Sequence, residues 1–251
     1  PTPYAEQLAG RVHRIAQEAR SVLTPAIEHV DAATLVRTFT IRANEGFVSV
    51  FAAALVTAIT TAAPHVRLRF APKPDKAAVP LRDGTIDVEI GTMEASAPEL
   101  RSQLLFRDRF VGVARRGHAL LDGAITPHRY AACRHVIASR RGASSGPVDD
   151  ALDALGLRRD IVAIVSSFLD ALDIARRSDL IALVPHACLR GGAAATEGLV
   201  AFELPVTTPD LSISVMWHPR LDADPAHRWL RQMLIATCRQ AVQPDGARRA
   251  T

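Results

Sequence analysis

Residues 36–71 read VRTFTIRANEGFVSVFAAALVTAITTAAPHVRLRFA, and this stretch shows two kinds of apolar periodicity. Its two ends, residues 36–43 and 66–71, alternate apolar and polar side chains, which is typical of half-buried β-strands. Between them, over residues 48–62, apolar side chains recur three or four positions apart, which indicates an amphipathic helix. A strand, a helix and a second strand at this spacing predict a parallel pair of strands joined by a right-handed crossover.

The same alternation continues along the chain. A short helix is predicted at residues 75–82, because Gly84 follows it in a position that favours a left-handed backbone. A third strand is predicted at residues 86–90. The next two apolar runs, residues 100–106 and 110–114, lie so close together that they predict an antiparallel or crossover pair of strands.

A second series of strands and helices follows the polar residues 115–126, which we expect to carry the chain from one lobe to the next. Strands are predicted at residues 135–139, 161–165, 180–184, 199–204 and 211–217, and helices at residues 148–156 and 168–177. The last helix begins at Pro225, and Asp224 is its expected N-cap. Two such α/β series predict a two-lobed clamp, in which the chain crosses between the lobes near residues 113–120 and again near residues 213–218.

The predicted domain limits follow from these crossings. Residues 25–112 and 214–242 are assigned to the first subdomain and residues 113–213 to the second. Residues 1–24 carry apolar side chains at coiled-coil spacing, at Leu8, Val12, Ile15, Ala19 and Val22. We interpret this segment as a linker helix that dimerises, and packing on its own domain is the alternative. Residues 243–251 are polar and Arg-rich and are predicted to be a disordered tail.

The composition excludes several classes of protein. With 251 residues, 48% of them hydrophobic and 22% charged, the chain has enough apolar residues for a sizeable core and is not a disordered, collagen-like or disulfide-stapled chain. Its three cysteines form no CxxC motif, and no dinucleotide or phosphate-binding glycine motif occurs, so neither a metal nor a cofactor is expected. Nothing reads as a signal peptide or a membrane span, which predicts a cytoplasmic protein without a membrane partner.

Three further motifs occur in a characteristic order and together resemble the LysR-type transcriptional regulators. Residues 81–91 read LRDGTIDVEIG, and residues 178–185 read SDLIALVP. Residues 217–231, WHPRLDADPAHRWLR, are similar to the C-terminal signature of the branch that includes nodulation regulators and regulators of aromatic-compound catabolism. The resemblance covers essentially the whole chain.

This resemblance implies a periplasmic-binding-protein-like (type 2) α/β domain with two Rossmann-like subdomains and a preceding linker helix. It implies a homodimer or homotetramer that binds a small, aromatic or otherwise planar effector in the cleft between the lobes. It also implies that promoter DNA is bound through an N-terminal winged-helix domain that this chain lacks. A transport solute-binding protein shares the clamp architecture and is the alternative, although it gives no reason for the apolar seam in residues 1–24.

The expected effector contacts come from the loops that follow the strands, because ligands of open α/β sheets bind outside the carboxyl ends of strands. The candidate residues are Asn44, Glu45, Ser49, Thr92, Met93, Ser139, Arg141, Ser144, Ser166, Ser167 and Phe168. Ser166 and Ser167 precede a helix whose N–H groups suit a ligand oxygen, although a serine there can also be a simple helix cap. Arg140 and Arg141 are candidates for a charged clamp. Phe168 is a candidate for stacking on an aromatic ligand, or else belongs to the core.

Two of the candidate positions raise specific questions. A carboxylate at Glu45 would repel an anionic ligand unless it points away or is paired. Residues 142–146 read GASSG and match the G-x-S-x-G pattern of serine hydrolases, with Ser144 in the place of the nucleophile. That nucleophile must follow its strand directly in a tight turn, whereas several loop residues intervene here and no oxyanion segment precedes it. Catalysis is therefore not expected, and hydrolysis by Ser144 is kept only as a remote alternative.

Overall fold

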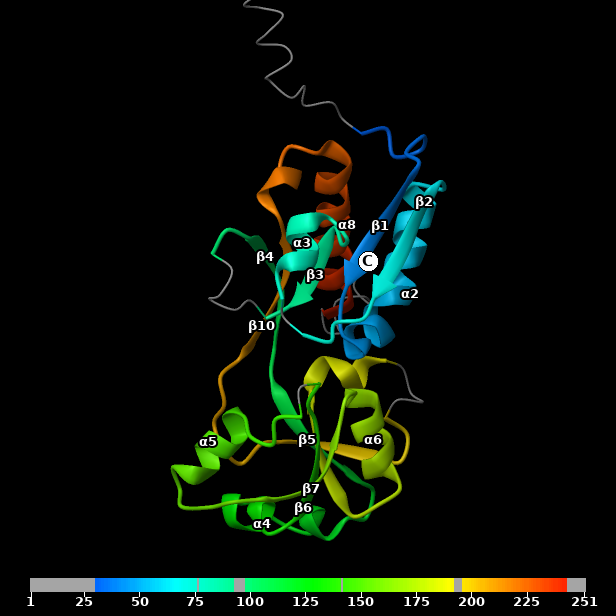
Figure 1. Ribbon diagram of the computed structural model, residues 1–251. Coiled ribbons are helices and arrows are strands. Elements are labelled where there is room, and N and C mark those ends of the chain that lie inside the picture. The colour runs from blue at the N-terminus through cyan, green and yellow to red at the C-terminus, as the bar shows by residue number, and fades with distance from the viewer. Residues whose placement is uncertain (1–29, 76, 93–97, 141, 192–195, 243–251) are drawn as a thin grey trace, which may run out of the picture.

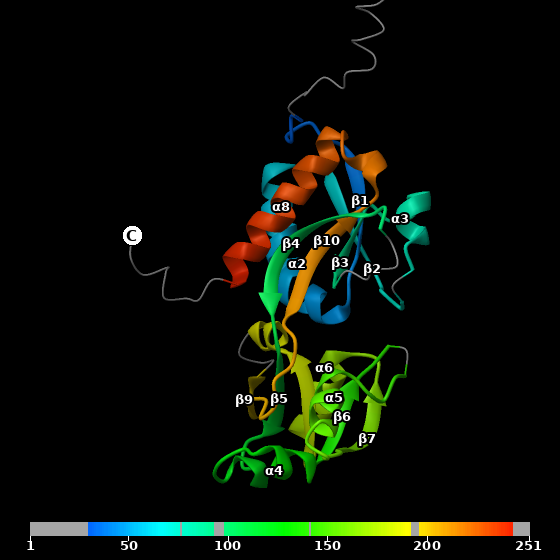
Figure 2. The ribbon, with the colours of Figure 1, turned by 90° about the vertical axis from the view of Figure 1, so that its left-hand side faces the viewer.

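The computed structural model describes residues 30–75, 77–92, 98–140, 142–191 and 196–242, which form two α/β lobes (Figures 1 and 2). Each lobe is built on a five-stranded sheet. The predicted linker helix at residues 1–24, the predicted tail at residues 243–251 and the candidate residues Met93 and Arg141 lie outside the described residues.

Lobe one contains a sheet with the strand order β2-β1-β3-β10-β4. Its strands are β1 (Arg37–Arg42), β2 (Val66–Ala71), β3 (Val88–Gly91), β4 (Arg101–Asp108) and β10 (Leu211–Trp217). Its helices are α2 (Glu45–Ala62), α3 (Val79–Asp83), η3 (Pro219–Leu221) and α8 (Pro225–Val242). β1 pairs in parallel with both β2 and β3, as the sequence predicts, and β10 runs antiparallel between β3 and β4.

The core of lobe one lies between its sheet and the helices α2 and α8. Phe39, Leu55 and Leu230, one from each of these layers, are fully buried. α2 begins at Glu45, three residues before the predicted start, because the Asn44 side chain accepts the backbone N–H of Phe47 (2.8 Å) and caps the helix. Length and composition alone would let α2 cross a membrane, but it packs as a core helix of this lobe, against the sheet and α8.

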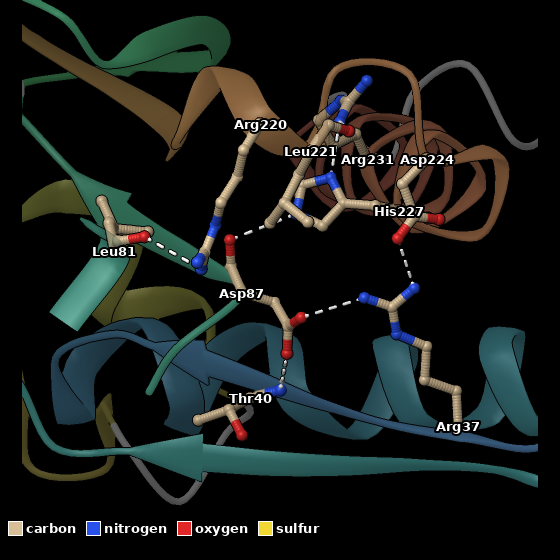
Figure 3. A network of polar contacts seen from close by, with 9 residues as sticks. All are labelled: Arg37, Thr40, Leu81, Asp87, Arg220, Leu221, Asp224, His227 and Arg231. Atoms are coloured by element: carbon tan, nitrogen blue, oxygen red, sulfur yellow. Dashed lines mark hydrogen bonds and ion pairs between the residues drawn. The ribbon is translucent and has the colours of Figure 1, made fainter. Parts of the chain in front are cut away.

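A polar network ties the start of β1 to α8 (Figure 3). The Arg37 guanidinium contacts the carboxylates of Asp87 (3.3 Å) and Asp224 (2.6 Å). Asp224, the predicted N-cap of the last helix, also accepts the backbone N–H of His227 (3.0 Å). The buried His227 ring lies 3.1 Å from the Asp87 carbonyl oxygen through Nε2. These four residues, from three distant parts of the chain, thus fix the point where the chain enters lobe one.

Lobe two repeats the topology of lobe one, with the strand order β7-β6-β8-β5-β9. Its strands are β5 (Phe110–Arg115), β6 (Arg134–Ala138), β7 (Asp160–Val165), β8 (Leu180–Pro185) and β9 (Leu199–Glu203). Its helices are η1 (Ala119–Leu121), α4 (Pro127–Ala131), α5 (Pro147–Asp153), α6 (Phe168–Arg176) and η2 (His186–Arg190). β6, β7 and β8 are parallel, and β5 runs antiparallel to β8 and β9.

The chain crosses between the lobes twice, and both crossings come earlier than predicted. β4 belongs to the first sheet and β5 to the second, so the first crossing is at Arg109 and not at residues 113–120. The second lies between Glu203 and Leu211 and not at residues 213–218. The predicted pairing of β4 with β5 is therefore wrong: a single residue separates them, which leaves no room for the two-residue turn of a tight hairpin, and each pairs with strands distant in sequence.

Candidate ligand-binding cleft

A cavity of about 310 Å³ lies between the lobes. Its lining residues are Pro74 and Asp75 from lobe one and Phe110, Ala138, Ser139, Arg140, Ala143, Ser166 and Phe168 from lobe two. A second hollow of about 190 Å³ shares Phe110, Ala138, Ser139, Ala143 and Phe168 with it and is lined further by Ile137, Val148 and Leu183, among others. Together they make a cleft with a polar mouth between the lobes and a mainly apolar interior in lobe two.

The structure brings four of the candidate residues together in this cleft. Ser139 lines both hollows, Arg140 and Ser166 line the larger one, and the Phe168 ring borders both. They meet because β6 and β7 are parallel neighbours, so the residues after each strand lie at one edge of the sheet. Phe110, at the start of β5, also borders both hollows. The sequence analysis missed it, because the predicted domain limits assign residue 110 to the first subdomain, whereas β5 belongs to the sheet of lobe two.

The other candidates lie elsewhere. Ser49, Thr92 and Ser144 line neither of the two hollows, and Ser49 and Ser144 are exposed. Asn44 caps α2 and borders a smaller hollow of about 50 Å³. Ser144 follows the end of β6 at Ala138 by six residues, so it lacks the strand-to-helix turn that a hydrolase nucleophile requires. Within the described ranges, no group of three or more His, Cys, Asp or Glu side chains is placed to hold a metal ion.

The N-terminus of α6 makes its hydrogen bonds within the chain. The Ser167 hydroxyl accepts the N–H groups of Leu169 (3.1 Å) and Asp170 (3.4 Å), so it is a helix cap. The N–H of Phe168 donates to Oε1 of Glu45 (2.9 Å), which reaches across from lobe one. These three N–H groups are therefore engaged, contrary to the expectation that they are open to a ligand oxygen, and the Glu45 carboxylate is paired.

A buried charge cluster of Arg42, Lys73 and Glu89 lies beside the cleft at the carboxyl ends of β1 and β2 and on β3. The three residues are only 4–5% exposed. Glu89 accepts Lys73 Nζ through Oε1 (2.7 Å) and Arg42 Nε through Oε2 (2.6 Å). Burial lowers the pKa of Lys73, Glu89 opposes this effect, and the charge of Arg140 on the other lobe lowers it further. Sequence reasoning missed this cluster, although Lys73 is one of only two lysines in the chain.

An ion pair in lobe two fixes the loop that closes the apolar hollow. Arg159, whose side chain is 2% exposed, holds both carboxylate oxygens of Asp149 (2.7 and 2.8 Å). Asp149 also accepts the N–H of Gly146 (2.9 Å), the residue that caps α5. Burial alone would raise the pKa of Asp149, but the hydrogen bonds and charge of Arg159 outweigh it and lower that pKa. The carboxylate is therefore charged and structural.

Comparisons with known proteins agree with this architecture. The family model of the LysR substrate binding domain matches residues 32–239. NahR, an HTH-type transcriptional activator from Pseudomonas putida, is 29% identical over 94% of this chain and 78% of its own length. Nodulation protein D 2 of Rhizobium tropici is 30% identical over 97% of this chain and 77% of its own. The regulatory domain of MexT, a transcriptional activator in Pseudomonas aeruginosa, superimposes with a TM-score of 0.70 at 25% identity, over 82% of this chain and all of that domain.

Two sheets of the same topology with a cleft between them define a periplasmic-binding-protein-like, type 2 effector domain. The chain belongs to the LysR substrate binding domain family, and it is the effector part of a LysR-type transcriptional regulator. The matched proteins are regulators, which favours this function over a transport solute-binding protein and over a hydrolase.

Proposed function

We propose that this chain senses a small planar, preferably aromatic, molecule in the cleft between the lobes. The observation that carries the proposal is the pair of rings, Phe110 and Phe168, that border both hollows of the cleft. Aromatic side chains offer flat apolar faces on which a planar ligand packs favourably. The volumes of the two hollows suit a substituted single ring rather than a macromolecule.

Polar groups at the mouth of the cleft give the ligand an orientation. Arg140 and the hydroxyls of Ser139 and Ser166 come from lobe two, and the carboxylate of Asp75 comes from lobe one. A ring with polar substituents places its apolar body in the inner hollow and its polar groups at the mouth. Such a ligand contacts both lobes, so it stabilises their closed arrangement by the difference between its affinities for the closed and open states.

In the intact regulator, this shift in lobe arrangement would reach promoter DNA through the N-terminal domain and the predicted linker helix at residues 1–24. The predicted homodimer or homotetramer would let one binding event move two DNA-binding domains relative to each other. Regulators of this kind act on the chromosome, which supports the expectation that the protein works in the cytoplasm. No catalytic step is part of this proposal.

A thermal-shift screen tests the proposal with benzoates, salicylates, nitroaromatics, phenols and aromatic amines. A ligand that binds only the folded state raises the melting temperature, and a hundredfold excess over Kd adds about 2.7 kcal/mol. We expect a dose-dependent rise that Phe168→Ala reduces at least tenfold in apparent affinity. Phe70→Ala, the same change on β2 away from the cleft, serves as the control and should leave the affinity unchanged. A flat panel, or equal loss in both variants, would contradict aromatic sensing in this cleft.

A further inference from the structure

Several hydrogen bonds join the two lobes, including those from Ala187 to Asp108 and from Arg190 to the end of α8, and one of them lies at the N-terminus of α6. Glu45 is the first residue of α2 in lobe one, and its Oε1 accepts the backbone N–H of Phe168, the first residue of α6 in lobe two (2.9 Å). The first N–H groups of a helix carry partial positive charge and lack partners inside the helix, so a carboxylate is the group that they bind best. A side chain of this protein therefore occupies a position that suits an anion.

The backbone around Glu45 is packed tightly against lobe two. A Cβ atom at Gly46 would lie 2.9 Å from Cys188 Sγ and 3.5 Å from the Phe168 ring. Gly46, Phe47 and Cys188 are buried, although they come from different lobes. The start of α2 can approach η2 and α6 this closely only because residue 46 has no side chain. The Glu45 hydrogen bond is thus one polar part of an extended contact between lobes.

We propose that Glu45 is an internal anion that helps to hold the two lobes together without an effector and closes the N-terminus of α6 to external anions. The proposal concerns regulation of the same cleft. It rests on the proposed function only where the Glu45 contact is expected to affect the sensing of an effector. Ser167 caps the next two N–H groups of α6, so removal of Glu45 frees the Phe168 N–H alone. The carboxylate group that this position accepts is already supplied by the chain.

Amide hydrogen exchange tests the proposal without any knowledge of the effector. In Glu45→Ala, we expect the Phe168 amide to exchange at least about tenfold faster, which is the effect of losing a hydrogen bond to a charged group. The amides of Leu169 and Asp170 should change little, because Ser167 still caps them. Small-angle X-ray scattering of the same variant should show a larger radius of gyration, because the lobes separate more easily.

Chemical rescue distinguishes an anion position from a merely structural contact. Sodium formate supplies a free carboxylate, so we expect it to slow the exchange of the Phe168 amide in Glu45→Ala. Because formate is not attached to lobe one, it should leave the radius of gyration of this variant unchanged. Sodium chloride at equal ionic strength and neutral formamide should not slow the exchange. Formate should not alter the exchange of the Phe168 amide in the protein that keeps Glu45, because Glu45 already fills the position.

Two further variants complete the design. Glu99→Ala removes a glutamate that pairs with Arg82 within lobe one and should leave the Phe168 amide unchanged. Glu45→Gln keeps an acceptor oxygen and loses the charge, so it should exchange faster than the unchanged chain and slower than Glu45→Ala. It also provides the measurement if Glu45→Ala does not fold. Unchanged exchange in either Glu45 variant, or faster exchange in Glu45→Ala that formate does not reverse, overturns the proposal whatever the aromatic screen shows.

Discussion

Glu89 is the residue on which the buried charges beside the cleft depend. It is 5% exposed and accepts hydrogen bonds from two buried cations, Arg42 and Lys73. Charges removed from water are stable only when they are paired and hydrogen-bonded. Asp75 lies 3.6 Å from Arg42 but is half-exposed, so it cannot replace Glu89 as the main partner. The Lys73 side chain, two residues after the end of β2, is therefore held by a carboxylate on β3.

We predict that Glu89→Ala lowers the free energy of unfolding by about 3–5 kcal/mol, because it leaves two buried cations without their shared partner. Urea unfolding followed by circular dichroism measures the change. The control is Glu99→Ala, which breaks a more exposed pair with Arg82 and should cost about 0–1 kcal/mol. Equal losses in the two variants would mean that burial of the cluster has no energetic importance.

His135 gives the protein a pH-dependent stability. It is fully buried, its Nε2 lies 3.0 Å from the Tyr130 carbonyl oxygen, and its Nδ1 has no hydrogen-bond partner among the described residues. Burial, and secondarily the charge of Arg159, lower the pKa of His135 from 6.5 to about 4. The folded protein therefore contains the neutral ring, which donates from Nε2.

We predict that stability falls as the pH is lowered from 7.5 to 5. Below pH 6.5 the unfolded chain binds a proton at His135, whereas the folded chain does so only near pH 4, so the proton favours unfolding. The contribution over this interval is roughly 2 kcal/mol. His135→Gln should reduce the pH dependence of urea unfolding by this amount, whereas His65→Gln, at an exposed position, should not. An unchanged pH dependence in His135→Gln would disprove the assignment.

At the scale of single residues, sequence reasoning located part of the cleft and little of its electrostatics. Ser139, Ser166 and Phe168 follow predicted strands, and the rule that strand ends meet at one edge of a sheet is local enough to apply to a sequence. The partners of Glu45 and Lys73 could not be predicted in the same way. Phe168 and Glu89 are distant from them in the chain, and only the packing of lobes and strands brings these pairs together.

At the scale of the elements, β5 and β9 fit together through a glycine and an aromatic ring. Gly112 is opposite Phe202 in the antiparallel register. A Cβ atom at Gly112 would lie 2.3 Å from the Phe202 ring, so the ring occupies the space that a side chain would need. The same ring meets the buried Tyr130 edge-on at a centroid distance of 6.3 Å. β9 is thereby held on β5 by side-chain packing as well as by backbone hydrogen bonds.

We predict that Gly112→Ala destabilises the protein by about 1–3 kcal/mol, because the added methyl group displaces the Phe202 ring. Combining it with Phe202→Ala should cost less than the sum of the two single changes, since the clash is then absent. Thermal unfolding of the four proteins gives the coupling. Gly146→Ala, where the added atom meets nothing within 4 Å, is the control. Additive losses would exclude a steric conflict between β5 and β9.

The strands and helices themselves were predicted better than their pairing. The parallel strands β1, β2 and β3 have strong alternating patterns, and α2 has a clear apolar face, because each depends on neighbouring residues alone. The start of α2 was missed by three residues, since the predicted start followed its first apolar side chain and not the Asn44 cap. The pairing of β4 was wrong because its partner, β10, is supplied from the other end of the chain.

At the scale of the whole molecule, the two lobes differ in continuity. All five strands of lobe two lie between Phe110 and Glu203, in one uninterrupted segment. Lobe one needs two segments, because β10 separates β3 from β4 in its sheet and α8 covers its core. Lobe two is in this sense inserted into lobe one (Figure 2).

We predict that a fragment of residues 109–208 folds alone, because it contains every strand of its sheet. A fragment of residues 30–108 should not fold, because β3 and β4 lose the strand between them and Phe39 and Leu55 lose the cover of α8. Cooperative thermal unfolding by circular dichroism distinguishes the two results. Cooperative unfolding of the shorter N-terminal fragment would show that β10 is not needed to complete lobe one.

The interrupted lobe also sets the order of events during protein synthesis. The ribosome makes β1 to β4 before lobe two, yet lobe two is complete once β9 has emerged, whereas lobe one waits for Leu211–Val242. At ordinary rates of translation this delay lasts about 2 to 8 seconds. Throughout it, nascent β3 and β4 have unpaired backbone edges that can bind strands of other chains. Of the two lobes, the one whose translation starts first is therefore the one that most needs a chaperone.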